Sequence, residues 1–297
     1  MKRFGFIVAT ALIGLSACGK GTPDLPPAAE FPAPGEAART VVKSAGENTR
    51  VLRYVAKVDA KNEADMDIDL SIDGGGMEMG FKMKLGALNS ITAVDPAGNF
   101  TQAMEITSAS VKLGGKLAEM GGDSAMFDDM MKGMKMSFKM DPQGRMLEAD
   151  LGDKENPMMG QMQAGMDQAM QGGVVPFPTE AVGIGAQWEA LSTVDMMGAK
   201  ARMVANYKLV ALDGDKGTLE FTLKGSADAQ KMTMPNVPGE VDLKALAIDA
   251  EGRIGFNLGN PTQGSVDMKM NMRMDLSAQG QSADMKMGMI IKMAAKP

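Results

Sequence analysis

Apolar and polar residues alternate strictly over residues 266–276, near the end of the chain. Met268, Met270, Met272 and Met274 occupy every second position, and charged or amide side chains fill the positions between them. Successive side chains of a β-strand point to opposite faces, so these methionines share one face. Such alternation is typical of an antiparallel strand with one buried face.

Two earlier runs, residues 65–72 and 77–85, repeat this alternation on either side of three consecutive glycines. Glycine runs mark turns, so we predict a hairpin here. Lys82 and Lys84 of the return run then lie across from the aspartates of the first run, which is a favourable cross-strand arrangement. The apolar face of the return run carries Met79, Phe81 and Met83.

The last run, residues 285–293, places Met287 and Met289 on one face. A short polar turn separates it from residues 266–276. We therefore predict a long final hairpin in which two rows of methionine are adjacent.

An Asp-x-x-Gly motif follows an apolar residue at three places, residues 95–98, 141–144 and 249–252. Aspartate hydrogen-bonds the backbone of a turn, and glycine takes the positive φ that follows. The motif also occurs in calcium loops, but the full series of ligands for an EF-hand is missing. We therefore predict three β-hairpins at these motifs.

Three stretches have a helical pattern. Residues 37–44 predict a short helix, and residues 116–132 predict a longer one that Gly121 and Gly122 weaken. Residues 156–171 predict a helix with a methionine stripe that includes Met162 and Met166. The fold predicted from these elements is mainly β (α+β), with a curved antiparallel sheet or half-barrel and one or two helices on its concave face.

The N-terminus is predicted to be a targeting signal. Residues 1–17 combine a charged start with a short apolar stretch, as in a secretory leader. The end of this stretch, Leu-Ser-Ala-Cys, resembles the lipobox of bacterial lipoproteins, which implies cleavage before Cys18 and lipidation of that cysteine. Gly19 then implies sorting to the outer membrane, facing the periplasm. Residues 18–36 are proline-rich and predict an extended tether.

Residues 37–297 are then predicted to form a single β-rich domain. A proline- and glycine-rich crossover at residues 174–188 divides its two sheet-forming halves.

The composition makes several functional classes improbable on chemical grounds. The chain has no histidine and a single cysteine, which removes the commonest general base and the usual zinc ligands. No nucleophile stands beside a base, so we expect a protein that is not an enzyme and holds no cofactor. Without Lys2 and Arg3 of the leader, 29 basic side chains face 37 acidic ones, a net charge of −8. An acidic surface argues against nucleic acid as a partner.

The crossover contains the motif Val-Gly-x-Gly-x-x-Trp at residues 182–188. This segment resembles an uncharacterised family of bacterial lipoproteins, which is similar in fold to envelope carriers with a half-barrel sheet. The resemblance implies a membrane-anchored protein that binds or carries an apolar molecule, such as an acyl chain or the tail of a lipoprotein.

The 32 methionines leave several interpretations open. Methionine fills irregular cores, so one interpretation is that the rows only pack the core. The protein would then be a lipoprotein with a purely structural or interaction role. They also suit a pliable cavity for an apolar ligand. Thioethers bind Cu(I) and Ag(I), for which Met232 and Met234 in a proline-containing loop are the best exposed pair, and exposed methionines also buffer oxidants. The candidate cavity residues are Met79, Phe81, Met83, Met136, Met162, Met166, Met270, Met272, Met287 and Met289.

Overall fold

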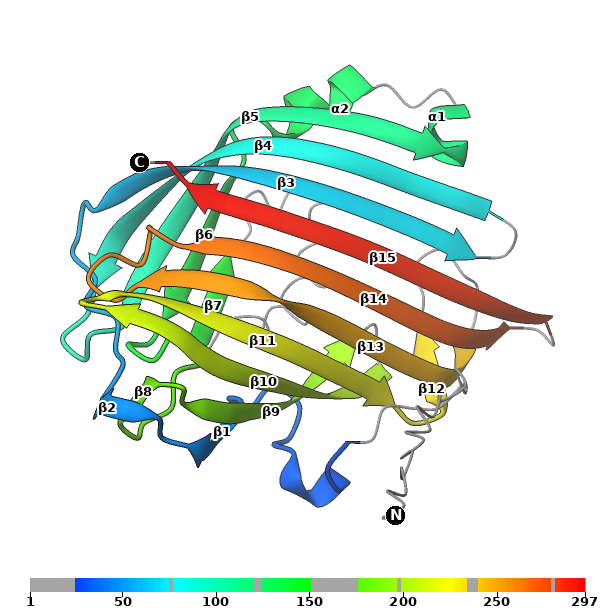
Figure 1. Ribbon diagram of the computed structural model, residues 1–297. Helices are drawn as coiled ribbons and strands as arrows, with labels where there is room; N and C mark the ends of the chain where they lie inside the picture. The colour runs from blue at the N-terminus through cyan, green and yellow to red at the C-terminus, as the bar shows by residue number, and fades with distance from the viewer. Residues whose placement is uncertain are drawn as a thin grey trace, which may run out of the picture.

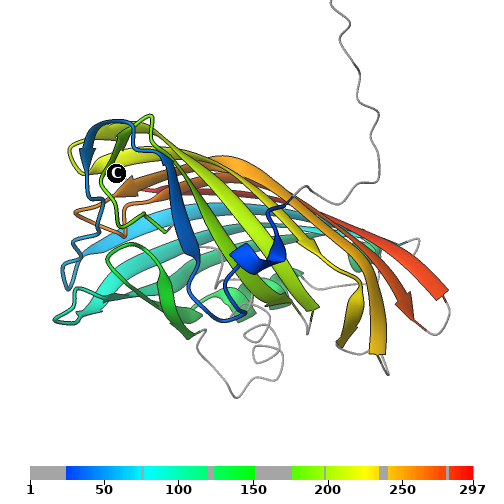
Figure 2. The same ribbon diagram turned by 90° about the horizontal axis from the view of Figure 1, so that it is seen from below.

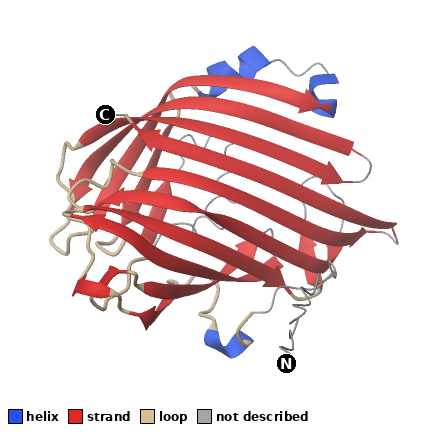
Figure 3. Cartoon of the chain, viewed as in Figure 1, coloured by secondary structure: helices blue, strands red, loops and turns tan. Residues whose placement is uncertain are grey.

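The computed structural model describes residues 25–74, 77–119, 124–150, 176–196, 199–233, 240–278 and 281–296. Within these residues, one 13-stranded antiparallel sheet dominates the fold, and a second sheet has two strands. The large sheet is strongly curved and remains open, so that it forms a trough (Figures 1 and 2). The prediction of a mainly β protein built on a large antiparallel sheet is confirmed, and Figure 3 shows how far strands predominate over helices.

The strands of the large sheet come from two halves of the chain. The first half supplies β1 (Arg39–Ser44), β3 (Lys61–Gly74), β4 (Met77–Val94), β5 (Phe100–Gly115), β6 (Lys135–Met140) and β7 (Met146–Asp150). The second half supplies β9 (Gln187–Met196), β10 (Ala199–Asp213), β11 (Lys216–Ala227), β12 (Gln230–Thr233), β13 (Glu240–Asn257), β14 (Ser265–Ala278) and β15 (Gln281–Ala295). Their order across the sheet is β1-β9-β10-β11-β13-β14-β15-β3-β4-β5-β6-β7, with β12 also paired to β13.

The last strand joins the two halves, because β15 pairs with β3. Their register sets Met289 opposite Leu70 and Met287 opposite Ile72. Alternation along each strand then gives the sheet one apolar face and one polar face. A slip of one residue would turn every methionine of β15 to the polar face.

The polar face carries a row of charges that alternate in sign from strand to strand. The register aligns Lys208, Glu220, Arg253, Asp267, Lys292, Asp67 and Lys84. Arg253 Nη2 lies 2.5 Å from Glu220 Oε1. The predicted pairing of lysines with aspartates in the β3–β4 hairpin is also present, with Lys82 Nζ 2.6 Å from Asp69 Oδ2.

Two of the three Asp-x-x-Gly motifs form the predicted turns. Asp95 Oδ1 accepts from the backbone N–H groups of Ala97 and Asn99 between β4 and β5. Asp141 Oδ1 accepts in the same way from Gln143 and Arg145 between β6 and β7.

The hairpin predicted at residues 249–252 is wrong, because β13 runs straight through this motif. Gly252 lies opposite Met268 in the sheet, and a Cβ at this position would come within 2.9 Å of the Phe221 ring. This glycine therefore serves close packing inside a strand and not a turn.

The helices do not confirm the prediction of helices on the concave face. In the described residues, α1 (Lys116–Glu119) and α2 (Ser124–Met131) lie along the edge of β5, beyond the end of β6 (Figure 1). There β5 pairs with β4 on one side but, within the described residues, has no strand on its other side, and Asp128 Oδ1 accepts from Val111 N–H at 2.6 Å. The second helix predicted, over residues 156–171, lies outside the described residues.

The short helix predicted at residues 37–44 is also wrong, because Arg39–Ser44 forms β1. Thr40, Val41 and Val42 are β-branched and favour a strand, and β1 pairs with β9 at one end of the sheet order. Before β1, the short 3₁₀ helix η1 (Ala28–Glu30) begins a segment that contacts the outer face, where Thr193 Oγ1 donates to Pro32 O at 2.7 Å. Part of the predicted tether therefore contacts the sheet.

Two segments cross one end of the trough on its apolar side. The first, residues 51–60, donates from Tyr54 N–H to Pro142 O and from Val55 N–H to Leu258 O. The second follows Pro176 and contains β8 (Val182–Ile184), which pairs with β2 (Glu47–Arg50). Together they join strands that lie far apart in the sheet order.

These crossing segments bring aromatic side chains together as a wall, which we define as Tyr54, Phe100, Phe177, Trp188, Tyr207, Phe221 and Phe256. Trp188 is 1% exposed, stacks on Tyr207 at 5.6 Å between ring centroids, and donates from Nε1 to Pro176 O at 3.1 Å. Phe177 lies between Tyr54 and Phe256. The aromatic wall therefore closes one end of the trough.

The two Asp-x-x-Gly turns, at Asp95 and Asp141, are expected to contribute unequally to the stability of the fold. Asp141 is 5% exposed and its Oδ2 also accepts from Arg145 Nε at 2.6 Å, whereas Asp95 is only partly buried. Asp141→Ala should lower the free energy of unfolding by about 2–3 kcal/mol, because it leaves buried donors without an acceptor. Asp95→Ala, the matched control, should cost clearly less, because water replaces the carboxylate.

Urea unfolding of both variants, followed by circular dichroism, measures this difference. Equal decreases in the free energy of unfolding would show that the burial of Asp141 adds nothing to the stability that its turn provides.

Candidate functional site

The apolar face of the central strands carries rows of side chains that run across β14, β15, β3 and β4. The register aligns Met270, Met289, Leu70 and Phe81 in one row. It aligns Met272, Met287, Ile72 and Met79 in the next row, and Met268, Ile291, Ile68 and Met83 in the row on the other side. We call these three sets the methionine rows. Seven of the predicted cavity residues lie in them.

Three pairs of methionine face each other directly between β14 and β15. The pairs are Met270 with Met289, Met272 with Met287, and Met274 with Met285. Side chains that are directly opposite in a sheet have Cβ atoms about 5 Å apart, so the thioethers of each pair are neighbours. The sequence predicted adjacent rows, and the structure supplies their pairing.

The methionine rows are half-buried at the centre of the trough. Met270, Met287 and Met289 are intermediate in exposure, whereas Met272 is 7% exposed and packs in a core cluster with Leu246 and Ile248. In the described residues, the helices contact β4 and β5 and do not reach β14 or β15 beyond minor contacts. The rows therefore offer flexible apolar surface that is neither a closed core nor fully open to water.

The remaining candidate residues differ in position. Met136 lies on β6 and packs in a cluster with Leu85, Ala87 and Ile106, beside the Met83 row. Met162, Met166, Met234 and the predicted lipidation site Cys18 lie outside the described residues. The predicted exposure of Met232 is wrong, because it lies in β12 opposite Val241 and is 5% exposed. Pairing with β13 buries this side chain in the core.

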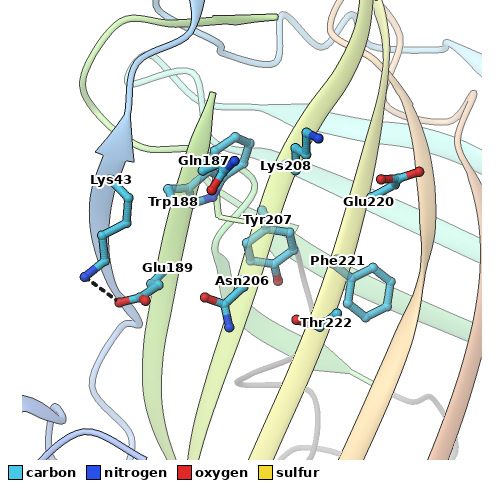
Figure 4. Close-up of a pocket in the computed structure, with 10 residues that line it drawn as sticks. All are labelled: Lys43, Gln187, Trp188, Glu189, Asn206, Tyr207, Lys208, Glu220, Phe221 and Thr222. Atoms are coloured by element: carbon cyan, nitrogen blue, oxygen red, sulfur yellow. Dashed lines mark ion pairs between the residues drawn. The ribbon is translucent and has the colours of Figure 1, made fainter. Parts of the chain in front are cut away.

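The outer face has a shallow hollow over β1, β9, β10 and β11, which Figure 4 shows with its ten lining residues. Lys43 Nζ lies 2.9 Å from Glu189 Oε2 at its edge. Lys208, Glu220 and Thr222 line the hollow as well, all from the polar face. Trp188, Tyr207 and Phe221, all buried, also belong to its lining, so the hollow combines charged and apolar groups.

Sequence reasoning missed the aromatic wall. Its residues come from strands and crossing segments that are distant in sequence, and no local pattern predicts that they meet. Burial raises the pKa of the Tyr207 and Tyr54 phenols, so both remain neutral at physiological pH. The wall is therefore an uncharged boundary for the methionine rows.

The described residues hold no group of three or more aspartate, glutamate or cysteine side chains that could bind a metal ion. No described helix is long and apolar enough to cross a membrane. No protein-family model matches the chain, and a search of curated proteins finds no match. The site is thus characterised by its geometry alone.

The two faces of the final hairpin predict opposite responses to charge. Met270→Asp combined with Met287→Asp should lower the free energy of unfolding by more than about 2 kcal/mol, because two charged carboxylates lose part of their water beside apolar side chains. Ser265→Asp combined with Ser282→Asp is the matched control, because both serines are exposed on the polar face and lie opposite uncharged residues. It should cost less than about 1 kcal/mol.

Thermal and urea unfolding of both double variants test this orientation. A fully stable Met270/Met287 variant would contradict the burial of the rows.

Proposed function

We propose that this protein is a non-catalytic envelope lipoprotein that binds or carries an apolar ligand, such as a lipid acyl chain, along its methionine rows. The observation that carries the proposal is the half-buried methionine surface at the centre of a curved sheet. Concave apolar surfaces with flexible side chains accept apolar molecules of varied shape. The leader, the lipobox and Cys18 support a location at the bacterial envelope, anchored by lipid to the outer membrane.

The shape of the site supports an elongated ligand. The apolar face of β14 runs from Val266 to Met274, a length of about 27 Å at roughly 3.3 Å per residue. At the Val266 end, the aromatic wall limits the space, with Phe256 and Leu258 packed in the same cluster as Phe221. A single chain that lies parallel to the strands and ends at the wall fits this arrangement.

A pair of neighbours on β15 tests the binding face. Met289 lies in the methionine rows, whereas Ile290 is on the polar face and is 40% exposed. Met289→Asn should weaken binding of an apolar fluorescent probe or a long-chain fatty acid at least tenfold, because the amide loses water under the ligand. Ile290→Asn is the matched control and should leave affinity unchanged.

Fluorescence titration of the full chain measures both affinities. For the unmodified protein, each further CH₂ of the fatty acid should add about 0.8 kcal/mol, a roughly fourfold gain, until the trough is filled. Absence of binding, or an equal loss in both variants, would overturn the proposal.

A second candidate function is the binding of Cu(I) or Ag(I), which the three facing methionine pairs favour. Clustered thioethers are good ligands for soft monovalent metals. The pair Met272 and Met287 places two sulfur-bearing side chains opposite one another at the centre of the rows.

Leucine substitutions separate the two functions. Met270→Leu, Met287→Leu and Met289→Leu together keep the volume and apolar character of the rows but remove three thioethers. The affinity for an apolar ligand should change less than about threefold in this variant, because the surface that the ligand covers stays apolar. Retention of Cu(I) against a chelator by the unmodified protein, together with its loss in the leucine variant, would support the metal function instead.

A further inference from the structure

The methionines of the trough fall into two classes of accessibility. On β14 and β15, seven methionines are intermediate in exposure: Met268, Met270, Met274, Met285, Met287, Met289 and Met293. Met140, Met232 and Met272 are 8%, 5% and 7% exposed and belong to core clusters. A peroxide in solution therefore reaches the thioethers of the first class more readily than those of the second.

We infer that the half-buried methionines of β14 and β15 form an oxidation site that controls ligand binding in the trough. This inference rests on the proposed apolar-binding function and adds its regulation. The co-reactant is a peroxide, such as hydrogen peroxide. The thioether sulfur attacks one peroxide oxygen, the O–O bond breaks, and that oxygen becomes the sulfoxide oxygen. The sulfur loses two electrons, and the peroxide is reduced to water.

The chemistry of the rows explains why this modification matters. A sulfoxide is polar and accepts hydrogen bonds, unlike the thioether it replaces. The facing partners in the rows are other methionines and aliphatic residues, Leu70 and Ile72 among them, whose side chains donate no hydrogen bond. In the free protein, water solvates the sulfoxide oxygen. Under an apolar ligand that oxygen loses its water without compensation, so the ligand binds more weakly.

The facing arrangement strengthens the effect. Because Met270 faces Met289 and Met274 faces Met285, oxidation of one pair introduces two polar groups at one point of the surface. Met232 and Met272 lie inside one core cluster, whereas Met270, Met274, Met285 and Met287 pack against its outside. Oxidation therefore adds oxygen at the edge of the core and not within it, so the sheet stays folded while its binding surface changes.

The test combines peroxide treatment, peptide mapping by mass spectrometry and titration with N-phenyl-1-naphthylamine, all on the full chain. We expect oxidation at the seven half-buried methionines of β14 and β15 before Met232 and Met272, unchanged circular dichroism, and at least a tenfold loss of affinity for the probe. Saturation with the probe before treatment should slow oxidation of the same seven residues.

The control is a variant in which leucine replaces the seven half-buried methionines of β14 and β15, namely Met268, Met270, Met274, Met285, Met287, Met289 and Met293. Its affinity for the probe should fall much less on treatment than that of the unmodified protein, because β14 and β15 then offer no thioether within reach of the peroxide. Probe binding that survives full oxidation of the unmodified protein, or oxidation that reaches Met232 and Met272 first, would overturn this inference. Failure of the untreated protein to bind any apolar probe would overturn the proposed function as well, so the two failures are distinguishable.

Discussion

The pairing of β15 with β3 is the contact on which the trough depends. It joins the last strand of the chain to one of the first long strands, and it makes one sheet from two halves. Without it, β15 would be an open edge of the sheet. Its methionines and those of β14 would then be separated from Leu70, Ile72 and the side chains of β4. The contact is entirely non-local, so its loop-closure entropy must be offset by the apolar surface that it buries.

Charge on the outer face compensates for a weakness of methionine on the inner face. A flexible side chain adapts to several registers, so the methionine rows define strand alignment poorly. The charges on the outer face define the alignment of β13 and β14 more strictly, because Arg253 is opposite Asp267 and Glu251 is opposite Lys269. A slip of two residues in either direction sets like charges against each other, which is unfavourable. The molecule thus combines an adaptable inner surface with an outer surface that specifies the fold.

The sequence predicted those features that depend on local pattern. Period-two alternation identified the β3–β4 and β14–β15 hairpins and the shared face of their methionines, and the Asp-Pro turns at Asp95 and Asp141 followed from turn chemistry. The same motif at Asp249 led to a wrong prediction of a hairpin. The apolar residues Ile248, Ala250 and Ile254 in fact keep the period of two through the motif. That unbroken period, with no proline in the motif, was the better signal.

Features that depend on tertiary contacts were not predictable in this way. The placement of α1 and α2 follows from the short length of β6, which pairs only with residues 100–105 of β5. Among the described residues, the rest of β5 therefore has β4 as a neighbour on one side and no strand on the other. The burial of Met232 follows from its pairing with β13. The aromatic wall requires Tyr54, Phe177 and Phe256 to meet from three distant segments, and only the folded chain brings them together.

Native mass spectrometry of the full chain, purified from a bacterial envelope, tests the central claim most directly. The account predicts co-purifying acyl species that are released on denaturation, whereas a lipid on Cys18 would stay covalently attached. It also predicts their loss from a variant with a polar residue at Met289. A protein that carries no releasable apolar species and acquires none from added lipid would contradict the claim that the methionine rows are a binding surface.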